Sequence, residues 1–466
     1  MSKERLWQNV DDNSEMLRKA ARDIWDHPEL SLEEEYASKL QAEIMTDMGF
    51  KVTHGLSCLP TGMVAEYGSG GPVIGIIGEY DALSGLSQKS QPNREPVTVG
   101  APGHGCGHNL LGVGGMGAAI AVKDAIERGE VSGTVRYYGC PAEEELLGKI
   151  YMLRDGYFDD CDVLLYWHPS SNNIPWRSPL LASRSIVYHF KGVTAHAPQA
   201  HLGRSALDAV ELMNVGANYL REHLSRDIYL HYSILGNGIA PNSVPDRCEV
   251  WYMMRAPKVS ILDPAVQRLN NVARGAALMT GTELTNIEVL GGGNETISNQ
   301  TLADLLCDNM EEIGGPGFTA EEYEYAKKIY DQFTPEELER GAQAFEVPME
   351  DLHKVLQTDI MRNSTAAFIP ASGDFDHSWV KPFGSVFIAT WPIGVFTHTW
   401  QATACTGSDV GFRGMLFAAK TLAGATYDLM KDQTLLKKVK EEFEHTTKDI
   451  EYKFNIAADA IPRRVQ

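Results

Sequence analysis

The chain has 466 residues, 43% hydrophobic and 22% charged, which is the balance of an ordinary globular protein. That length exceeds what one hydrophobic core usually serves, so two domains are expected. A formal net charge of -21 argues against nucleic acid or an anionic membrane surface as a partner. No apolar run reaches the length of a membrane-spanning helix, and no signal-peptide pattern opens the chain. The seven cysteines are scattered, which suits reduced thiols, so we expect a cytoplasmic protein.

Helical and strand patterns alternate over the first part of the chain. An amphipathic pattern over residues 11–50 predicts two helices, with Ser31 as the N-cap of the second. Further on, the predicted strands cover 72–78, 134–140 and 162–167, and the predicted helices cover 110–128 and 143–154. This alternation favours an α/β sheet with helices on both faces.

The pattern changes near Ser183, where alternating strands appear. The predicted strands are 185–191, 248–255 and 283–290, and the predicted helices are 207–224 and 265–279. These elements make a second unit of about a hundred residues, a usual size for a small domain. The run Gly291-Gly292-Gly293 predicts a hinge back to the first unit. We therefore expect one domain from residues 1–183 and 294–466, and another from residues 184–293.

The first domain carries an insertion in its second segment. Residues 315–363 are acidic and helical in pattern, and Thr319 and Thr334 each mark a helix start rich in glutamate. We interpret this insertion as a solvated helical cap without a direct chemical role. A strand over 385–390 and a Gly/Ala-rich helix over 410–430 then return to the pattern of the first domain.

The stretch His104-Gly105-Cys106-Gly107-His108-Asn109 brings two imidazoles and one thiol close together. In an extended or looped backbone the side chains of Cys106 and His108 point to one side, and the glycines let the backbone approach an ion closely. Thiolate and imidazole suit zinc, and imidazole also serves manganese and cobalt. Alone, the stretch favours a metal site only modestly over a glycine-rich loop around a buried thiol, so its interpretation depends on later residues.

Three later segments offer further metal ligands. Glu143, Glu144 and Glu145 open a predicted helix, where they serve either the helix dipole or a metal, one carboxylate binding the ion while its neighbour holds water. His168 ends a predicted strand, at the edge where open α/β sheets bind ligands, although a lone histidine there is more often structural. His398 is equally ambiguous alone. The combined ligand set, sufficient for two ions, is Cys106, His108, Glu144, His168 and His398.

In this order the motifs resemble the dinuclear metallopeptidases related to carboxypeptidase G. They are most similar to the amidohydrolase branch with a cysteine ligand, which includes plant indole-acetyl-amino-acid hydrolases, bacterial N-acyl-amino-acid hydrolases and p-aminobenzoyl-glutamate hydrolase. The supporting segments are 103–112 (GHGCGHNLLG), 240–246 (APNSVPD), 389–391 (ATW) and 398–401 (HTWQ). The resemblance covers essentially the whole chain. It implies a catalytic α/β domain with a mixed sheet flanked by helices, and an inserted α+β domain that serves as lid and dimerisation surface.

The resemblance also implies a role for each motif. The ligands of two divalent ions, zinc or manganese with cobalt also suited, fall on Cys106, His108, Glu144, His168 and His398. The general base falls on Glu143, which takes a proton from the attacking water and hands it to the leaving nitrogen. The adjacent Glu145 leaves open a shift of one residue between base and ligand. Asp81 is expected to orient a ligand through a hydrogen bond, and no role is assigned to Glu79 or His377.

The lid carries further expected site residues. Residues 192–197 (GVTAHA) resemble a segment whose histidine, here His196, reaches an active site, commonly that of the partner subunit, and polarises the scissile carbonyl. His196 is equally interpreted as a loop residue in the dimer interface. Asn242 and Arg255 match positions that contact the substrate carboxylate, and a guanidinium can hold a carboxylate through two parallel hydrogen bonds.

The expected activity is metal-dependent hydrolysis of the amide bond of N-acyl or aroyl amino acids, with p-aminobenzoyl-glutamate as the most specific substrate. A dipeptidase and a hydrolase of another N-acyl conjugate are the nearest alternatives. A non-catalytic subunit of a hetero-oligomeric hydrolase is a third, which the intact ligand set and Glu143 disfavour. The lid is expected to join two subunits, either two copies of this chain or this chain and a related one. The family pattern differs at Asn109, Cys140 and 373–379, without loss of a ligand.

Overall fold

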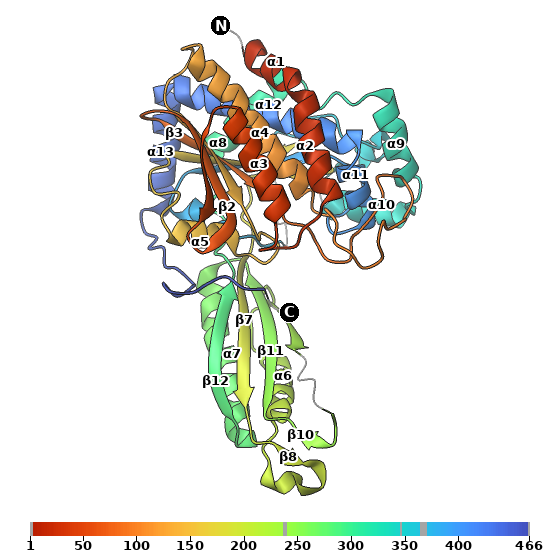
Figure 1. The fold of residues 1–466 in the computed structure, drawn as a ribbon, viewed down its shortest axis with the longest axis vertical. Coiled ribbons are helices and arrows are strands. Elements are labelled where there is room, and N and C mark those ends of the chain that lie inside the picture. Colours follow the sequence, from red (N-terminus) through yellow and green to blue (C-terminus); the bar gives the residue numbers. More distant parts are fainter. Residues whose placement is uncertain (1–2, 236–239, 345–346, 364–370, 465–466) are drawn as a thin grey trace.

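The computed structural model describes residues 3–235, 240–344, 347–363 and 371–464. They form a large α/β unit and a smaller lobe that projects from it (Figure 1). The lobe is one stretch from the middle of the chain, coloured yellow to green, whereas the red N-terminal and blue C-terminal parts build the large unit together. The expected fold class, a mixed α/β domain with a smaller inserted α+β unit, is confirmed.

The large unit is built on a mixed sheet of seven strands. In order across the sheet these are β1 (Lys51–Leu56), β2 (Leu59–Gly68), β4 (Thr134–Cys140), β3 (Val73–Glu79), β5 (Val163–Ser170), β13 (Phe383–Ala389) and β6 (Ile174–Pro175). The strands from β4 to β13 run parallel, and β1, β2 and β6 are antiparallel to their neighbours. Parallel strands end at the same edge of a sheet, so β3, β4 and β5 bring Glu79, Cys140 and His168 to one region.

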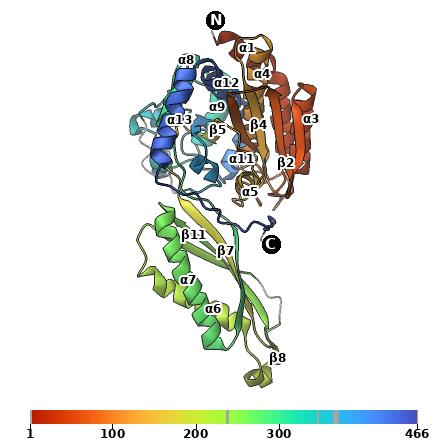
Figure 2. The same ribbon diagram turned by 90° about the vertical axis from the view of Figure 1, so that its left-hand side faces the viewer.

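Helices pack around this sheet and complete its core (Figure 2). They are α1 (Glu4–Asp12), α2 (Ser14–Asp26), α3 (Glu35–Asp47), α4 (His108–Glu127), α5 (Gly148–Arg154), α8 (Gln300–Ile313), α11 (Trp400–Thr406), α12 (Asp409–Lys431), α13 (Gln433–Thr447) and the short 3-10 helix η3 (Asp376–Trp379). The central helix α4 packs against β3 and α12. This packing is close, because a Cβ on Gly114 would lie 2.9 Å from the indole Nε1 of Trp167 in β5.

By length and composition α4 could cross a membrane, although no such run was expected from the sequence. In the structure 83% of its most apolar window is buried. The helix lies between β3 and α12, inside the large unit. Its apolar residues therefore serve the core of the protein.

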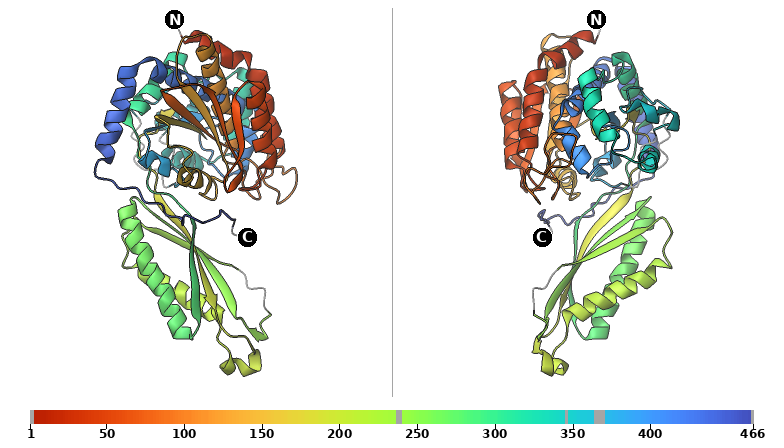
Figure 3. Two further views of the ribbon diagram at one scale, coloured as in Figure 1. Left: turned by 60° about the vertical axis from the view of Figure 1, so that its left-hand side comes forward. Right: turned by 90° about the vertical axis from the view of Figure 1, so that its right-hand side faces the viewer.

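The smaller lobe has its own sheet and its own core (Figure 3). Its antiparallel strands are, in order, β12 (Glu283–Gly291), β7 (Ala182–Lys191), β11 (Arg247–Ala256) and β9 (Tyr229–Leu235), and its helices are α6 (Ala206–Arg221) and α7 (Val259–Thr280). Its far end carries β8 (Ala195–His196), β10 (Ser243–Val244) and the 3-10 helix η1 (Ala197–Leu202). The two connections to the large unit lie side by side, because Ser183 N donates to Gly293 O at 2.8 Å.

The acidic segment predicted as a helical insertion contains α9 (Ala320–Tyr330), α10 (Pro335–Ala344) and the 3-10 helix η2 (Met349–Lys354). The start of α9 is a complete capping box, in which Thr319 Oγ1 accepts from Glu322 N and the Glu322 carboxylate accepts from Thr319 N. Ile329 of α9 packs with Trp391 and Cys405 of the large unit. The insertion is therefore anchored to the core.

Some local predictions are confirmed and others are wrong. The two helices predicted over residues 11–50 are α2 and α3, but Ser31 does not cap α3, because it donates its hydroxyl hydrogen to Asp81 instead. The helix predicted from Glu143 begins only at Gly148. The sequence patterns gave no sign of β1, β2, β9, α8 and α13. In β1 most side chains are exposed, so it lacks the hydrophobic pattern that reveals a strand.

Candidate metal centre

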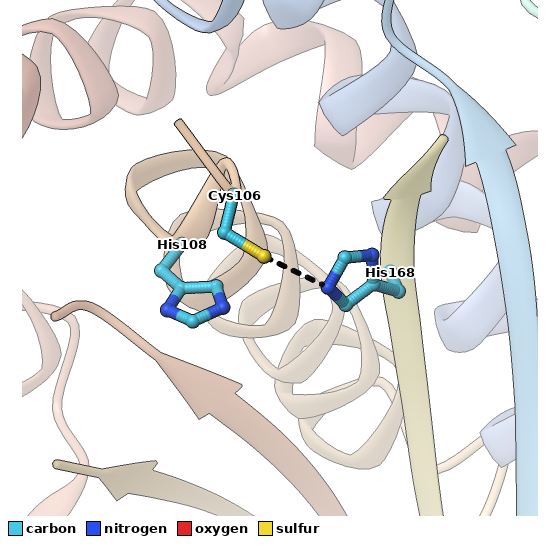
Figure 4. A group of neighbouring side chains, drawn as sticks. All are labelled: Cys106, His108 and His168. Carbon is cyan, nitrogen blue, oxygen red and sulfur yellow. Dashed lines mark hydrogen bonds between the residues drawn. The ribbon is translucent and has the colours of Figure 1, made fainter. Parts of the chain in front are cut away.

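Three side chains of the predicted ligand set meet where β5 lies beside the start of α4. Cys106 precedes α4, His108 is its first residue, and His168 belongs to β5. One ligand atom of each lies within 4.8 Å of those of the other two, and Cys106 Sγ is 3.4 Å from His168 Nε2. Figure 4 shows the thiol and both rings facing the same space. Between Cys106 and His108, Gly107 has a left-handed backbone (φ 86°), which turns the chain into the helix.

The buried Asp81 carboxylate forms hydrogen bonds that orient residues of this group. Its Oδ1 accepts from His108 Nδ1 at 2.8 Å, which leaves His108 Nε2 as the free ring nitrogen. Its Oδ2 accepts from Ser31 Oγ at 2.8 Å and from Glu144 N at 2.9 Å. Burial alone would raise the pKa of Asp81, but the His108 imidazole and these hydrogen bonds hold the pKa below its ordinary value. Such contacts are typical of a carboxylate that orients a metal-binding histidine.

Glu143 and Glu144 lie in a tight turn and not in a helix. Ala142 (φ 54°) and Leu146 (φ 58°) both have left-handed backbones, which side chains other than glycine rarely adopt. After the turn, Gly148 comes so near the preceding backbone that a Cβ there would overlap a carbonyl oxygen. The turn directs both carboxylates into the cavity that Cys106, His168 and His398 also line.

A second group of ligand atoms contains Cys106 again. Cys106, Glu144 and His398 offer atoms within 4.8 Å of one another, and His398 Nε2 lies 3.4 Å from Glu144 Oε2. His398 N donates to Gly105 O at 2.9 Å, which joins two segments far apart in the sequence. The structure therefore gathers all five predicted ligands into two groups that share the Cys106 thiol.

This donor set fits divalent cations that bind nitrogen, sulfur and oxygen. Burial lowers the pKa of His168 to about 4, and partial desolvation lowers that of His398, whose side chain is half exposed, to about 4, so both imidazoles are neutral near pH 7. Burial raises the pKa of the Cys106 thiol and raises that of Glu144 to about 7, and a nearby cation favours the ionised form of both. Within the described residues, His108 Nε2 and Glu144 Oε1 are buried without a hydrogen-bond partner, as expected of atoms that bind an ion.

Four of the five predicted ligands, Cys106, Glu144, His168 and His398, line a cavity of about 370 Å³, and the buried His108 is not among its lining residues. One wall is aromatic: Trp176 and Phe387 stack with ring centroids 4.9 Å apart, and Phe375 meets Trp176 edge-on at 5.6 Å. From the lobe, Arg255 at the end of β11 reaches the cavity, and its Nε is buried without a hydrogen-bond partner in the part of the chain described. Three larger surface hollows, of about 850, 670 and 500 Å³, contain none of the predicted site residues.

His196 in β8 and Asn242 just before β10 lie together at the far end of the lobe, whereas most residues that line the cavity belong to the large unit (Figure 1). His196 pairs with Ser243 across β8 and β10, and the Asn242 carbonyl accepts from Ala197 N at 2.9 Å. Both side chains are exposed. Within one chain the structure therefore brings Arg255 to the ligand groups, but not His196 or Asn242.

Some residues around the site could not be predicted from the sequence. Trp176 and Phe387 have no pattern that distinguishes a cavity wall from the core. Lys149 is fully buried beside Glu79 and Asp374, whereas a lysine in a predicted helix is usually exposed. Asp374 had a weak signal, because it lies in the segment that departs from the family pattern.

Comparison with known proteins gives a relative that matches from end to end. The chain is 36% identical to a subunit of p-aminobenzoyl-glutamate hydrolase from Escherichia coli strain K12, over 477 aligned residues covering 98% of each chain. The chain belongs to this family of metal-dependent hydrolases. The resemblance inferred from the motifs is therefore confirmed, and so is the expectation of an enzyme of the amidohydrolase and metallopeptidase class. No protein-family model matches the chain.

Two solved structures share the fold of this chain. An aminobenzoyl-glutamate utilization protein from Klebsiella pneumoniae is 17% identical, with a TM-score of 0.60 and coverage of 91% of this chain and 98% of that one. The Bacillus subtilis YXEP protein, described as a dinuclear metal-binding peptidase of the M20 family, is 19% identical, with a TM-score of 0.55 and coverage of 90% and 99%. At such low identity these likenesses concern the fold alone, and the role of each site residue is argued from geometry.

Replacing Asp81 by asparagine tests whether it orients His108. Asp81→Asn keeps the size of the side chain but removes the charge that holds the imidazole, so we expect divalent ions to bind about 10- to 100-fold more weakly. The measurement is competition for Zn²⁺ with a chromophoric chelator. Ser31→Ala, which removes one hydrogen bond to the same carboxylate, is the control and should have a much smaller effect. Unchanged affinity in folded Asp81→Asn would contradict the assignment.

Proposed function

We propose that this chain hydrolyses the amide bond of N-acyl and N-aroyl amino acids with the help of two divalent ions, and that p-aminobenzoyl-glutamate is its substrate. One observation carries the proposal: four of the five predicted metal ligands, Glu143 and an Arg255 with a buried, unsatisfied Nε line a single cavity, and the fifth ligand, His108, lies within ligand distance of Cys106 and His168. The full-length relative, a subunit of p-aminobenzoyl-glutamate hydrolase, supports the substrate class.

Two divalent ions, when bound, supply a more acidic water and polarise the amide carbonyl. Glu143 suits the role of proton carrier, because its side chain lines the cavity and its Oε2 lies 3.8 Å from His108 Nε2. Burial, together with the neighbouring charge of Glu79, raises the pKa of Glu143 well above its ordinary value. A carboxylate with a raised pKa accepts a proton from water more readily and can then pass it to the leaving nitrogen.

The cavity walls suit an aroyl amino acid. Arg255 is a cation without an ion-pair partner among the described residues, and its fork of N–H groups matches a carboxylate such as that of glutamate. Trp176, Phe375 and Phe387 offer flat apolar faces for an aromatic acyl group. An apolar wall disfavours the charged amino terminus of a dipeptide. We therefore prefer an acyl-amino-acid hydrolase to a dipeptidase.

The proposed ions are zinc or manganese, with cobalt as a suitable substitute, because all three accept mixed nitrogen, sulfur and oxygen ligands. We also infer a cytoplasmic location. All seven cysteines are free, which suits a reducing compartment.

A substrate panel with metal-loaded protein tests the function. We expect p-aminobenzoyl-glutamate to be cleaved faster than N-acetyl-glutamate and a dipeptide ending in glutamate. Glu143→Gln should lower kcat by about 10²- to 10⁴-fold, because it removes the proton carrier, while the number of bound ions stays the same. Glu145→Gln is the matched control and should keep its activity.

Each other outcome has a defined meaning. A large loss in Glu145→Gln with little loss in Glu143→Gln would shift base and ligand by one residue each, so that Glu144 is the base and Glu145 the ligand. If the wild-type protein binds its ions but hydrolyses no substrate, the result would favour the alternative that this chain is a non-catalytic subunit of a hetero-oligomeric hydrolase.

We further propose that the lobe joins two subunits and that His196 serves the cavity of the partner. His196 belongs to β8 at the far end of the lobe, whereas most residues that line the cavity belong to the large unit (Figure 1). Strand β9 is an edge strand with Tyr232 and Ile234 exposed, and Tyr219 on α6 is 72% exposed. Exposed apolar side chains beside an unpaired strand edge favour association. The partner is a second copy of this chain or a related subunit.

Mixing two inactive variants tests the role of His196. If His196 acts in the partner's cavity, a hybrid of His196→Ala and Glu143→Gln contains one intact site, and an equal mixture recovers about a quarter of the wild-type activity. Native mass spectrometry of differently tagged subunits reports whether hybrids form. Hybrids that form but stay inactive would count against the proposal.

A further inference from the structure

Lys149 is a buried cation beside the proposed metal-binding side chains. Its Nζ lies 2.6 Å from Glu79 Oε1 and 2.5 Å from Asp374 Oδ1, and none of the three side chains is exposed. Lys149 N donates to Asp374 Oδ2 at 2.6 Å. The Nζ also lies 4.8 Å from the centroid of the Phe375 ring, whose face attracts a cation. One ammonium group therefore serves two carboxylates and an aromatic ring of the cavity wall.

Glu79 links this ion pair to the proposed metal-binding groups. Its Oε1 faces Lys149, and its Oε2 accepts from Tyr166 OH at 3.0 Å and lies 3.3 Å from His108 Nε2. Glu79, His108 and Glu143 offer ligand atoms within 4.8 Å of one another. Glu79 is therefore near enough to bind an ion held by His108. A carboxylate bound there would take the place of the water that a catalytic site must keep.

We propose that Lys149 is a positioning residue that holds Glu79 off the ion at His108 and so keeps a coordination position open for water. This inference rests on the proposed metal-dependent function. Lys149 and Tyr166 give each oxygen of Glu79 a donor from the protein. Without the ammonium, Oε1 loses its partner in a buried setting, and an unpaired carboxylate beside a divalent cation moves toward it.

The segment on the other side of Lys149 supports the same role. Asp374 follows Gly373, where a Cβ would lie 3.2 Å from Glu143 Oε1, so this segment packs directly against the proposed base. Lys149 ties it to Glu79 at the end of β3. The competing explanation is an ion pair that serves only the fold. Buried ion pairs often contribute little net stability, so a readout at the metal is needed to separate the two explanations.

The test uses protein loaded with Co²⁺, whose visible absorption reports the number and type of its ligands without any substrate. Lys149→Met removes the charge and keeps the length of the side chain. We expect an altered Co²⁺ spectrum as Glu79 joins the ion, and a fall in kcat of about tenfold or more with KM changed by less than about threefold. The double variant Lys149→Met/Glu79→Gln should regain the wild-type spectrum and part of kcat, because a neutral amide is a poor ligand. Lys420→Met, which removes a surface ion pair with Asp11, is the control.

The outcomes separate the explanations. Folded Lys149→Met with an unchanged spectrum and unchanged kcat would overturn the proposal. If Lys149→Met does not fold, the double variant Lys149→Met/Glu79→Gln is used instead, because it does not bury the unpaired charge of Glu79. A wild-type Co²⁺ spectrum of the double variant supports the proposal, and an altered spectrum overturns it. A wild-type protein that binds Co²⁺ but cleaves no substrate would defeat the proposed function, while the spectra would still test the role of Lys149.

Discussion

The Asp81 carboxylate is the contact on which the rest of the site depends. It joins Ser31, the ring of His108 and the backbone of Glu144, which come from three separate segments of the chain. Because Asp81 binds His108 through Nδ1, Nε2 is the ring nitrogen left to face the cavity groups. Because it also binds Glu144 N, it fixes the tight turn that holds the two carboxylates. One buried carboxylate thus sets the positions of both a proposed ligand and the proposed base.

Charge balance explains the surroundings of this contact. Burial raises the pKa of Glu144 to about 7 and that of Asp374 to about 7, so the site favours cations close to these groups. Lys149 supplies one cation on the side of Asp374 and Glu79. The proposed metal ions supply the positive charge around the Cys106 thiol. Arg255 is left to bind an anionic substrate. Each of these cations has a different proposed task.

The sequence was sufficient for the fold class and the family, and it named five candidate ligands that the structure brings into two groups, because each of these predictions depends on local signals. Cys106 and His108 share one glycine-rich stretch, and His168 ends a strand whose apolar run is easily recognised. The turn at Glu143 was wrongly predicted as helix, since its left-handed backbone depends on the Asp81 contact from another segment. The sequence also did not predict the ion pair of Lys149 with Glu79, because only the folded sheet brings the end of β3 next to α5. Contacts between distant segments leave no periodic pattern.

The number of ions that one chain binds tests the central claim, which is a dinuclear site around a shared thiol. The measurement is elemental analysis of protein dialysed against limiting Zn²⁺, for the wild type, His168→Ala, His398→Ala and Cys106→Ser. We predict two ions in the wild type, weakened binding of one ion in each histidine variant, and weakened binding of both in Cys106→Ser, because the thiol belongs to both ligand groups. A single ion in the wild type, or full retention of both ions in Cys106→Ser, would contradict the shared-thiol site.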